Sequence, residues 1–267
     1  VFTLALFVRA GTFFVLPLLG LWAGQHFKSD HQRINWTAVL GSSLACLMAF
    51  ALNKFLIMHF AAPGAGLMSN FSWTLYGLVT GKGWLFAAKT LPQTGHSASE
   101  YHHLIYQQSL QFFLKQPLVL LKTLWSNMLH FQIYAPYSLA YFIVMGASLL
   151  MPVGSASPQR KSVICLLFCL CTVGLLLAIG VIDFRQAGPL LGLCISLHCL
   201  AYLYYLSKQS LPIAQFFLYV LIGIIASAAI LWDDGRARVF AASMPLYIGA
   251  YLCTLYYFFF PAHLAEH

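Results

Sequence analysis

Long apolar runs alternate with short polar connections along most of the chain. A helix needs about 20 apolar residues to cross the hydrocarbon core of a bilayer. The pattern predicts seven such helices, at residues 1–23, 36–61, 135–152, 163–182, 188–206, 210–231 and 239–260. The connection 183–187 is tight, so the fourth and fifth runs could instead form a broken or re-entrant pair.

Residues 62–134 form the long stretch between the second and third predicted spans. The stretch opens with the flexible residues 63–66, PGAG, and the polar residues 93–100 predict a loop. A helical pattern then runs through residues 101–115. Pro117 begins a second helix, because proline is tolerated in the first turn of a helix.

The helix that begins at Pro117 is amphipathic. Lys122, Ser126 and His130 recur every four residues and therefore share one face. Apolar side chains occupy the other face: Leu118, Leu121, Trp125 and Met128. Such a helix typically lies in the membrane interface, so we expect residues 62–134 to rest on the bilayer.

Charged residues are scarce in this chain. Of its 267 residues 61% are hydrophobic and 7% are charged, whereas a soluble domain has roughly 25% charged residues. We therefore predict an all-α polytopic transmembrane bundle of about seven spans and exclude a water-soluble globule. The predicted parts are two transmembrane helices in 1–61, an external or interfacial segment in 62–134, about five transmembrane helices in 135–260, and a short cytoplasmic tail in 261–267.

Basic residues in short loops predict which side of the membrane each connection faces. Three predicted connections carry them: the loop 24–35 with Lys28 and Arg33, the loop 153–162 with Arg160 and Lys161, and the turn near 207–210 with Lys208. Alternation places these three on the cytoplasmic side and places residues 62–134 and 233–238 on the outer face. The arginines of 233–238 run against the charge bias, which makes them candidates for a function.

The net charge of +8 points to lipid head groups and phosphates as partners, and not to nucleic acid, because the basic residues lie in short connections or near span ends. Arg9 lies inside the first predicted span, where a charge is costly. Together with Arg236 and Arg238, it could form a cationic cluster near the outer face that grips a lipid phosphate or pyrophosphate. Lys54 and His59 could join this cluster or simply extend to the interface.

The chain lacks the common motifs of soluble enzymes and of metal sites. Gly81 and Gly83 form a lone Gly-x-Gly, and Glu100, His102 and His103 point in different directions on a helix. The seven cysteines fall within apolar runs. We therefore predict neither a metal site nor a disulfide framework in these residues.

Three stretches resemble motifs of one family of membrane enzymes. These are VRAGTFFVLP at 8–17, NFSWTLYGL at 70–78 with GKGW at 81–84, and DGRARVFAASMP at 234–245. In this order and spacing they resemble the C-type glycosyltransferases, which are related to protein O-mannosyltransferases and lipid A aminoarabinose transferases. Ala10 stands where the family often has proline.

The resemblance implies a multi-pass enzyme of the bacterial inner membrane that transfers a sugar from a polyprenyl phosphate at the outer face. Arg9, Arg238, Asp234 and Arg236 would bind the lipid phosphate or the donor, and Asn70, Tyr76 and Lys82 would line the external loop. The family's catalytic carboxylate lies after its first span, so we expect that group upstream of residue 1. Any divalent metal would belong to that upstream part. The acceptor would be a glycan, a lipid or a protein.

Two alternatives remain open from the sequence. A transporter or lipid-linked-sugar flippase would need no external carboxylate and would place charges at mid-membrane depth on several helices. The chain could also be a folded remnant without activity of its own. The gathering of charges toward one membrane face favours the transferase.

Overall fold

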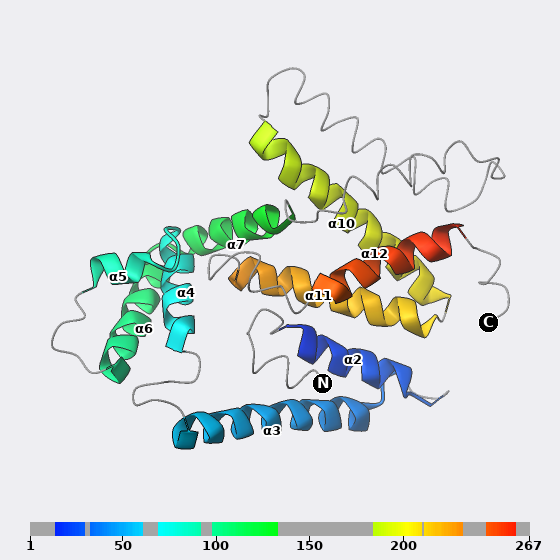
Figure 1. Cartoon of the computed structure of the whole chain (residues 1–267), viewed down its shortest axis with the longest axis horizontal. Coiled ribbons are helices and arrows are strands. Elements are labelled where there is room, and N and C mark those ends of the chain that lie inside the picture. Colours follow the sequence, from blue (N-terminus) through cyan, green and yellow to red (C-terminus); the bar gives the residue numbers. More distant parts are fainter. Residues whose placement is uncertain are drawn as a thin grey trace. The chain divides into compact units, whose positions relative to one another are not determined.

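The computed structural model describes residues 14–29, 33–60, 69–91, 98–132, 184–209, 211–231 and 244–259. In these ranges the regular elements are α-helices and no strand is present (Figure 1). The predicted all-α class is therefore confirmed for the described part of the chain. Helices suit so apolar a chain because they satisfy their own backbone hydrogen bonds without water.

The chain divides into two compact units, which we describe separately. The first comprises Val1–Met128 and Ile225–Ala242, and the second comprises Leu129–Ile224 and Ser243–His267.

In the first unit, α2 (Val15–His26) and α3 (Trp36–Phe60) form an antiparallel hairpin (Figure 1). Gly20 lets the helices approach closely, because a Cβ there would lie 2.9 Å from Ser42 Oγ. Asn35 caps α3, since its side-chain oxygen accepts a hydrogen bond from the Ala38 N–H at 3.1 Å. The described residues of the predicted connection 24–35 thus include the end of α2 and the cap of α3.

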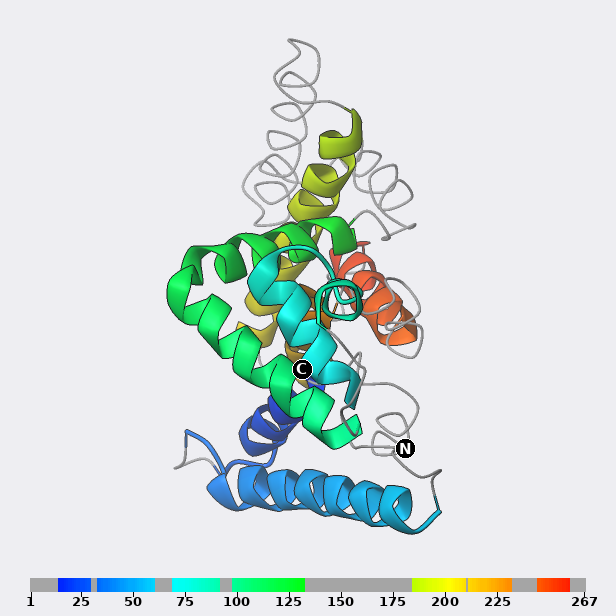
Figure 2. The ribbon, with the colours of Figure 1, turned by 90° about the vertical axis from the view of Figure 1, so that its left-hand side faces the viewer.

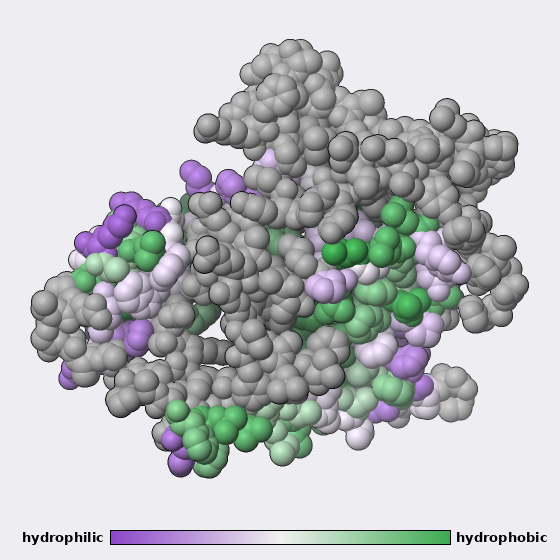
Figure 3. Space-filling view, in the orientation of Figure 1, coloured by the Kyte–Doolittle hydropathy of each residue, from purple (hydrophilic) through white to green (hydrophobic). Residues whose placement is uncertain are grey.

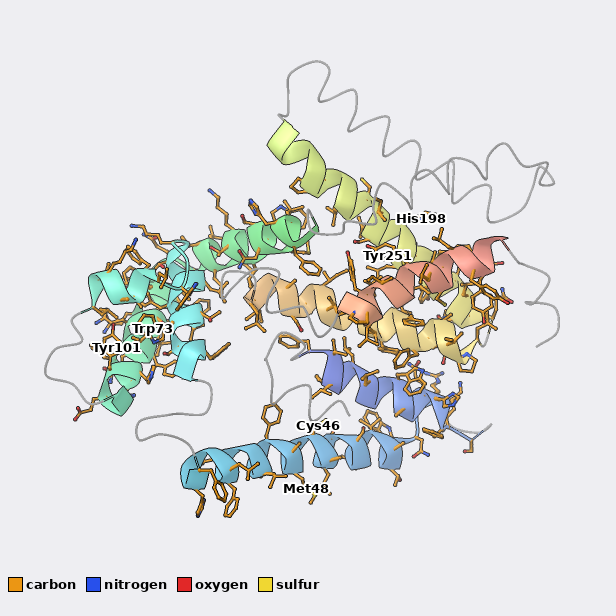
Figure 4. The ribbon with its side chains drawn as sticks, viewed as in Figure 1. Cys46, Met48, Trp73, Tyr101, His198 and Tyr251 are labelled. Atoms are coloured by element: carbon orange, nitrogen blue, oxygen red, sulfur yellow. The ribbon has the colours of Figure 1, made fainter. Side chains whose placement is uncertain are left out.

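The face of α3 that lies away from α2 is apolar and exposed. Met48 lies on that face in Figure 4, and the hydropathy view shows apolar surface over α3 (Figure 3). Large exposed side chains run along the helix: Leu40, Leu44, Leu47, Met48, Leu52 and Phe55. A surface of this kind is typical of a helix in contact with lipid.

Two of the described helices are long and apolar enough to cross a membrane. They are the segment Trp36–Leu56 of α3 and α11, Pro212–Leu231. Both coincide with predicted spans, so the described residues support membrane association. The predicted spans 135–152 and 163–182 lie outside the described residues.

A second group of helices in the first unit follows α3. It consists of α4 (Ser69–Thr80), α5 (Phe86–Thr90), α6 (Ala98–Lys115) and α7 (Pro117–Gln132). Figure 2 looks onto this group and shows α6 alongside α4. The helices predicted at 101–115 and from Pro117 are confirmed, whereas the motif at 70–77, expected in a loop, lies within α4.

The core between α4, α5 and α6 is aromatic. Tyr76, Ala87, Tyr101 and Ile105 are buried at its centre, and Trp73, Phe86 and Leu91 pack around them. Trp73 meets the edge of Tyr101, with ring centroids 5.8 Å apart (Figure 4). These contacts give α4–α6 a hydrophobic core of their own.

The second unit is built on α10 (Phe184–Lys208) and α12 (Met244–Phe259), with most of α11. The helix α10 begins at Phe184, so most of the connection expected at 183–187 is helical. Gly249 of α12 faces the ring of Phe217 on α11, whose nearest atom would lie 2.7 Å from an added Cβ. The helix α10 ends at Lys208 and α11 begins at Pro212, close to the turn predicted at 207–210.

Candidate functional site

The loop that follows α4 is held in shape by three glycines. A Cβ on Gly77 would lie 2.6 Å from the carbonyl carbon of Gly83, which is closer than real Cβ contacts come. Gly81 and Gly83 have φ angles of 68° and 78°, in the left-handed region that glycine adopts readily. Residues 81–84 therefore form a defined turn that lies against the end of α4.

This turn presents Lys82 at the surface. The Lys82 N–H donates to the Gly77 carbonyl oxygen at 3.3 Å, and its ammonium group lies 4.6 Å from the centroid of the Phe86 ring. The side chain is exposed. An exposed ammonium group beside an aromatic ring can still interact with a phosphate.

The other predicted loop residues have different positions. Tyr76 is 3% exposed, and its hydroxyl lies 3.3 Å from Thr90 Oγ1. Its ring stacks on Phe86 and meets the edge of Phe112. Tyr76 is thus part of the core, whereas Asn70 lies in the first turn of α4.

A pair of hydrogen bonds ties the end of α11 to the rest of the first unit. The Phe14 N–H donates to Ser227 Oγ at 3.0 Å, and Asn127 Nδ2 of α7 donates to the Ala229 carbonyl oxygen at 3.1 Å. Ser227 and Asn127 are buried. The end of α11 therefore contacts both the start of α2 and the middle of α7.

The middle of α7 also contacts the glycine turn. An added Cβ on Gly81 would lie 3.3 Å from Thr123 Oγ1 and 3.3 Å from Val119 Cγ1. Thr123 lies one helical turn before Asn127, so one face of α7 meets the turn that carries Lys82 and then the end of α11. Through α7 and its own bond to Phe14, the end of α11 is thus linked to the start of α2 and to the glycine turn. These three segments are distant in the sequence.

Phe14 and the glycine turn belong to the predicted motifs at 8–17 and 81–84, and the end of α11 precedes the motif at 234–245. Arg9 precedes Phe14 by five residues, Asp234 follows Leu231 by three, and Lys82 lies in the turn itself. Arg9, Asp234, Arg236 and Arg238 lie outside the described residues. The observed contacts concern their described chain neighbours.

The residues that make these contacts were not singled out from the sequence. Ser227 is an isolated polar residue within an apolar run, whereas Thr123 and Asn127 directly follow Lys122 and Ser126 in an amphipathic helix. A polar residue that the surrounding pattern would place in the core usually has a hydrogen-bond partner. That expectation flags such positions, but it does not identify the partner.

The surface of α4–α7 is basic. In residues 69–91 and 98–132 the exposed charges are Lys82, Lys89, Lys115 and Lys122, with Glu100 as the carboxylate. His102 accepts or donates a hydrogen bond at 2.8 Å from Ser72 Oγ, and His103 pairs with Gln107 at 3.2 Å. The surplus of lysines favours an anionic partner.

In the second unit, hydroxyl groups meet between α10 and α12. Ser196 Oγ lies 3.2 Å from the hydroxyl of Tyr247 and 2.9 Å from that of Tyr251, and the two tyrosine hydroxyls are 2.8 Å apart. One turn along, Cys199 Sγ lies 3.0 Å from Thr254 Oγ1. Side-chain hydrogen bonds of this kind join helices in a membrane.

Comparison with known proteins does not identify a family for this chain. No protein-family model, curated protein or solved structure matches the chain. The resemblance to C-type glycosyltransferases therefore stays a prediction, and the function has to be argued from the chain's own chemistry.

Proposed function

We propose that the chain is part of a membrane glycosyltransferase that uses a polyprenyl-phosphate sugar at the outer face of a bacterial inner membrane. The main support is a set of contacts: the end of α11 bonds Phe14 and α7, and the glycine turn lies against α7. These contacts link segments that contain or lie near the three predicted motifs, which supports a common site.

The proposed site would bind the phosphate of the donor. Arg9 and Arg238 would bond its oxygens, and Asp234 would orient Arg238, which follows it by four residues. Arg236 is a further phosphate ligand in this scheme. Lys82, exposed on a rigid turn beside α7, would supply a cation from the external segment.

The reaction would be an inverting transfer. The acceptor hydroxyl oxygen bonds to the anomeric carbon of the sugar, while the bond from that carbon to the phosphate oxygen breaks. The electron pair stays on the phosphate, where the arginines stabilise its charge. The hydroxyl proton passes to a carboxylate, as the family resemblance implies.

Binding of the unsubstituted lipid product tests the phosphate site without knowledge of the sugar. The intact protein in detergent is titrated with a polyprenyl phosphate, and retained lipid is counted by native mass spectrometry. Arg9→Gln and Arg238→Gln should each lose most of the binding, because each removes charge-assisted hydrogen bonds. Arg33→Gln, an exposed arginine of the predicted cytoplasmic turn, is the matched control and should bind normally.

Unchanged binding in both variants would refute the phosphate site. Loss of binding in Arg33→Gln as well would show a non-specific charge effect, which also counts against it. Thermal unfolding of each variant checks that the protein remains folded.

A lipid-linked-sugar flippase is the second candidate function. The exposed lysines of α4–α7 suit it as well, because they can hold an anionic head group without any transfer step. A flippase would move the lipid-linked sugar between leaflets and leave it intact. Chemical analysis of the donor after incubation in proteoliposomes therefore separates the two functions.

A further inference from the structure

The end of α6 and the start of α7 form an exposed apolar corner. We define the α6–α7 corner by six side chains: Leu110, Phe113, Leu114, Leu118, Leu121 and Trp125. Leu118 is 75% exposed and Leu114 is 69% exposed, on either side of the bend before Pro117. The corner is a concentrated apolar surface on an otherwise basic group of helices.

The exposed residues of α7 include large apolar side chains as well as Lys122 and His130. Its apolar residues Leu118, Leu121 and Trp125 face outward, whereas Thr123 and Asn127 are buried toward the protein. The buried groups are satisfied: Thr123 Oγ1 donates to the Val119 carbonyl oxygen at 2.8 Å, and Asn127 bonds the Ala229 carbonyl. This distribution fits a surrounding medium of hydrocarbon.

The charges beside the corner indicate which lipids it meets. From Tyr101 to Met128 the chain carries Lys115 and Lys122 and no Asp or Glu, and both lysines are exposed. Leu118 and Lys122 are both exposed and are one helical turn apart, so they share a face, and the prediction that put them on opposite faces is wrong at Leu118. The long stem of Lys122 can therefore extend from the apolar surface to the head groups. Trp125 is suited to the same depth.

We propose that the α6–α7 corner inserts into the membrane interface and selects anionic phospholipids through Lys115 and Lys122. A second copy of the chain suits the surface less well. A symmetric contact through the corner would bring lysines together without a carboxylate to pair with them. The proposal is independent of the sugar-transfer reaction.

Trp125 reports whether the corner lies in lipid. The intact protein is reconstituted in phosphatidylcholine nanodiscs whose acyl chains carry bromine, which quenches nearby tryptophan emission. The Trp125 component of the emission is the difference between the unmodified protein and Trp125→Phe. This component should be strongly quenched by the brominated lipids and poorly quenched by aqueous iodide. Trp84→Phe is the matched control, because Trp84 packs against Trp73 with ring centroids 6.2 Å apart and lies outside the corner.

A gain-of-signal variant protects the test against an effect of Trp125→Phe on folding. Adding Leu121→Trp in that background puts a reporter back on the same face and should restore lipid quenching. Quenching of the corner tryptophan by iodide would show that it faces water. Resistance to both quenchers would show that protein covers it, and either result would overturn the proposal.

Lipid preference tests the two lysines. Brominated phosphatidylglycerol is compared with brominated phosphatidylcholine as quencher of the Trp125 component in mixed nanodiscs. The preference for phosphatidylglycerol should fall about fivefold for each of Lys115→Gln and Lys122→Gln. Lys89→Gln, an exposed lysine on α5, should keep the preference. Equal quenching by both lipids in the unmodified protein would refute anionic selection.

Discussion

At the scale of single residues, Gly77 determines how the glycine turn meets α4. An alanine Cβ there would lie 2.6 Å from the Gly83 carbonyl carbon and 2.7 Å from the Trp84 nitrogen. Both are backbone atoms, which cannot rotate away. Gly77→Ala should therefore lower the free energy of unfolding by about 1–3 kcal/mol, despite the better helix propensity of alanine.

Gly41→Ala is the matched control for this prediction. Gly41 lies within α3, and nothing is found within 4 Å of an added Cβ. Alanine should stabilise that helix by about 0.5–1 kcal/mol. Thermal unfolding in detergent compares the two variants, and equal unfolding temperatures would contradict the close approach at Gly77.

Asn127 is the second residue that carries a testable contact. Asn127→Ala removes the donor to the Ala229 carbonyl oxygen in a buried place, at an expected cost of about 1–3 kcal/mol. Hydrogen exchange should then speed up near the end of α11. Gln107→Ala, an exposed amide on α6, should change neither quantity. An α11 that exchanges as in the unmodified protein would show that the contact is unimportant.

The sequence indicates residue types at the candidate site better than their roles. The glycines at 77, 81 and 83 were visible as part of a motif, and the turn does present Lys82 at the surface. Tyr76 belonged to the same motif but is in the core, because Phe86, Thr90 and Phe112 surround it. Which neighbours a residue finds depends on the packing of α5 and α6, which spacing within α4 does not reveal.

At the scale of elements, the strongly patterned helices were predicted well and α4 was not. The helices α6 and α7 follow an apolar repeat, and Pro117 marks the start of α7. In α4 the hydroxyl residues Ser72 and Thr74 are buried, whereas the family resemblance implied that this motif belongs to an external loop. Ser72 is satisfied by His102, which lies 30 residues away in the sequence. Tertiary pairing of this kind overrides the local pattern.

The contact between α4–α5 and α6 should weaken at alkaline pH through Tyr101. Burial raises the pKa of the Tyr101 phenol above its ordinary 10.0, and nearby Tyr76 acts in the same direction. The neutral hydroxyl donates toward the Leu91 carbonyl oxygen at 3.3 Å. Its stabilising contribution is therefore fully present below pH 10 and is lost as the pH rises through the raised pKa.

Tyr101→Phe provides the comparison for this pH dependence. The unmodified protein should lose stability faster than the variant above pH 10, because phenylalanine has no proton to lose. Thermal unfolding at a series of pH values measures the difference. Parallel curves for the two proteins would exclude Tyr101 as the titrating group.

At the scale of the whole molecule, the sequence predicts alternating spans, and the described part supports them at α3 and α11. Both helices are long and apolar enough to cross a bilayer. The helix α12 has only 16 residues and bonds α10 through buried hydroxyl groups. Its place in the second unit therefore depends on packing against α10 and not only on its apolar length. Apolar length predicts which segments enter a membrane, whereas these interhelical partners follow from tertiary structure.

The predicted orientation can be tested across both candidate spans by cysteine labelling. Lys82→Cys and Asp233→Cys should react with a membrane-impermeant maleimide in sealed right-side-out vesicles, because both sites are predicted on the outer face. Arg33→Cys and Lys208→Cys should react only after the vesicles are opened, and the unmodified chain measures the background from its own cysteines. Labelling of Arg33→Cys and Lys82→Cys from the same side would show that α3 does not cross the membrane. The same result for Lys208→Cys and Asp233→Cys would show that α11 does not cross the membrane. Residues 233–238 would then lie on the same side as Lys208, and not on the side of the glycine turn.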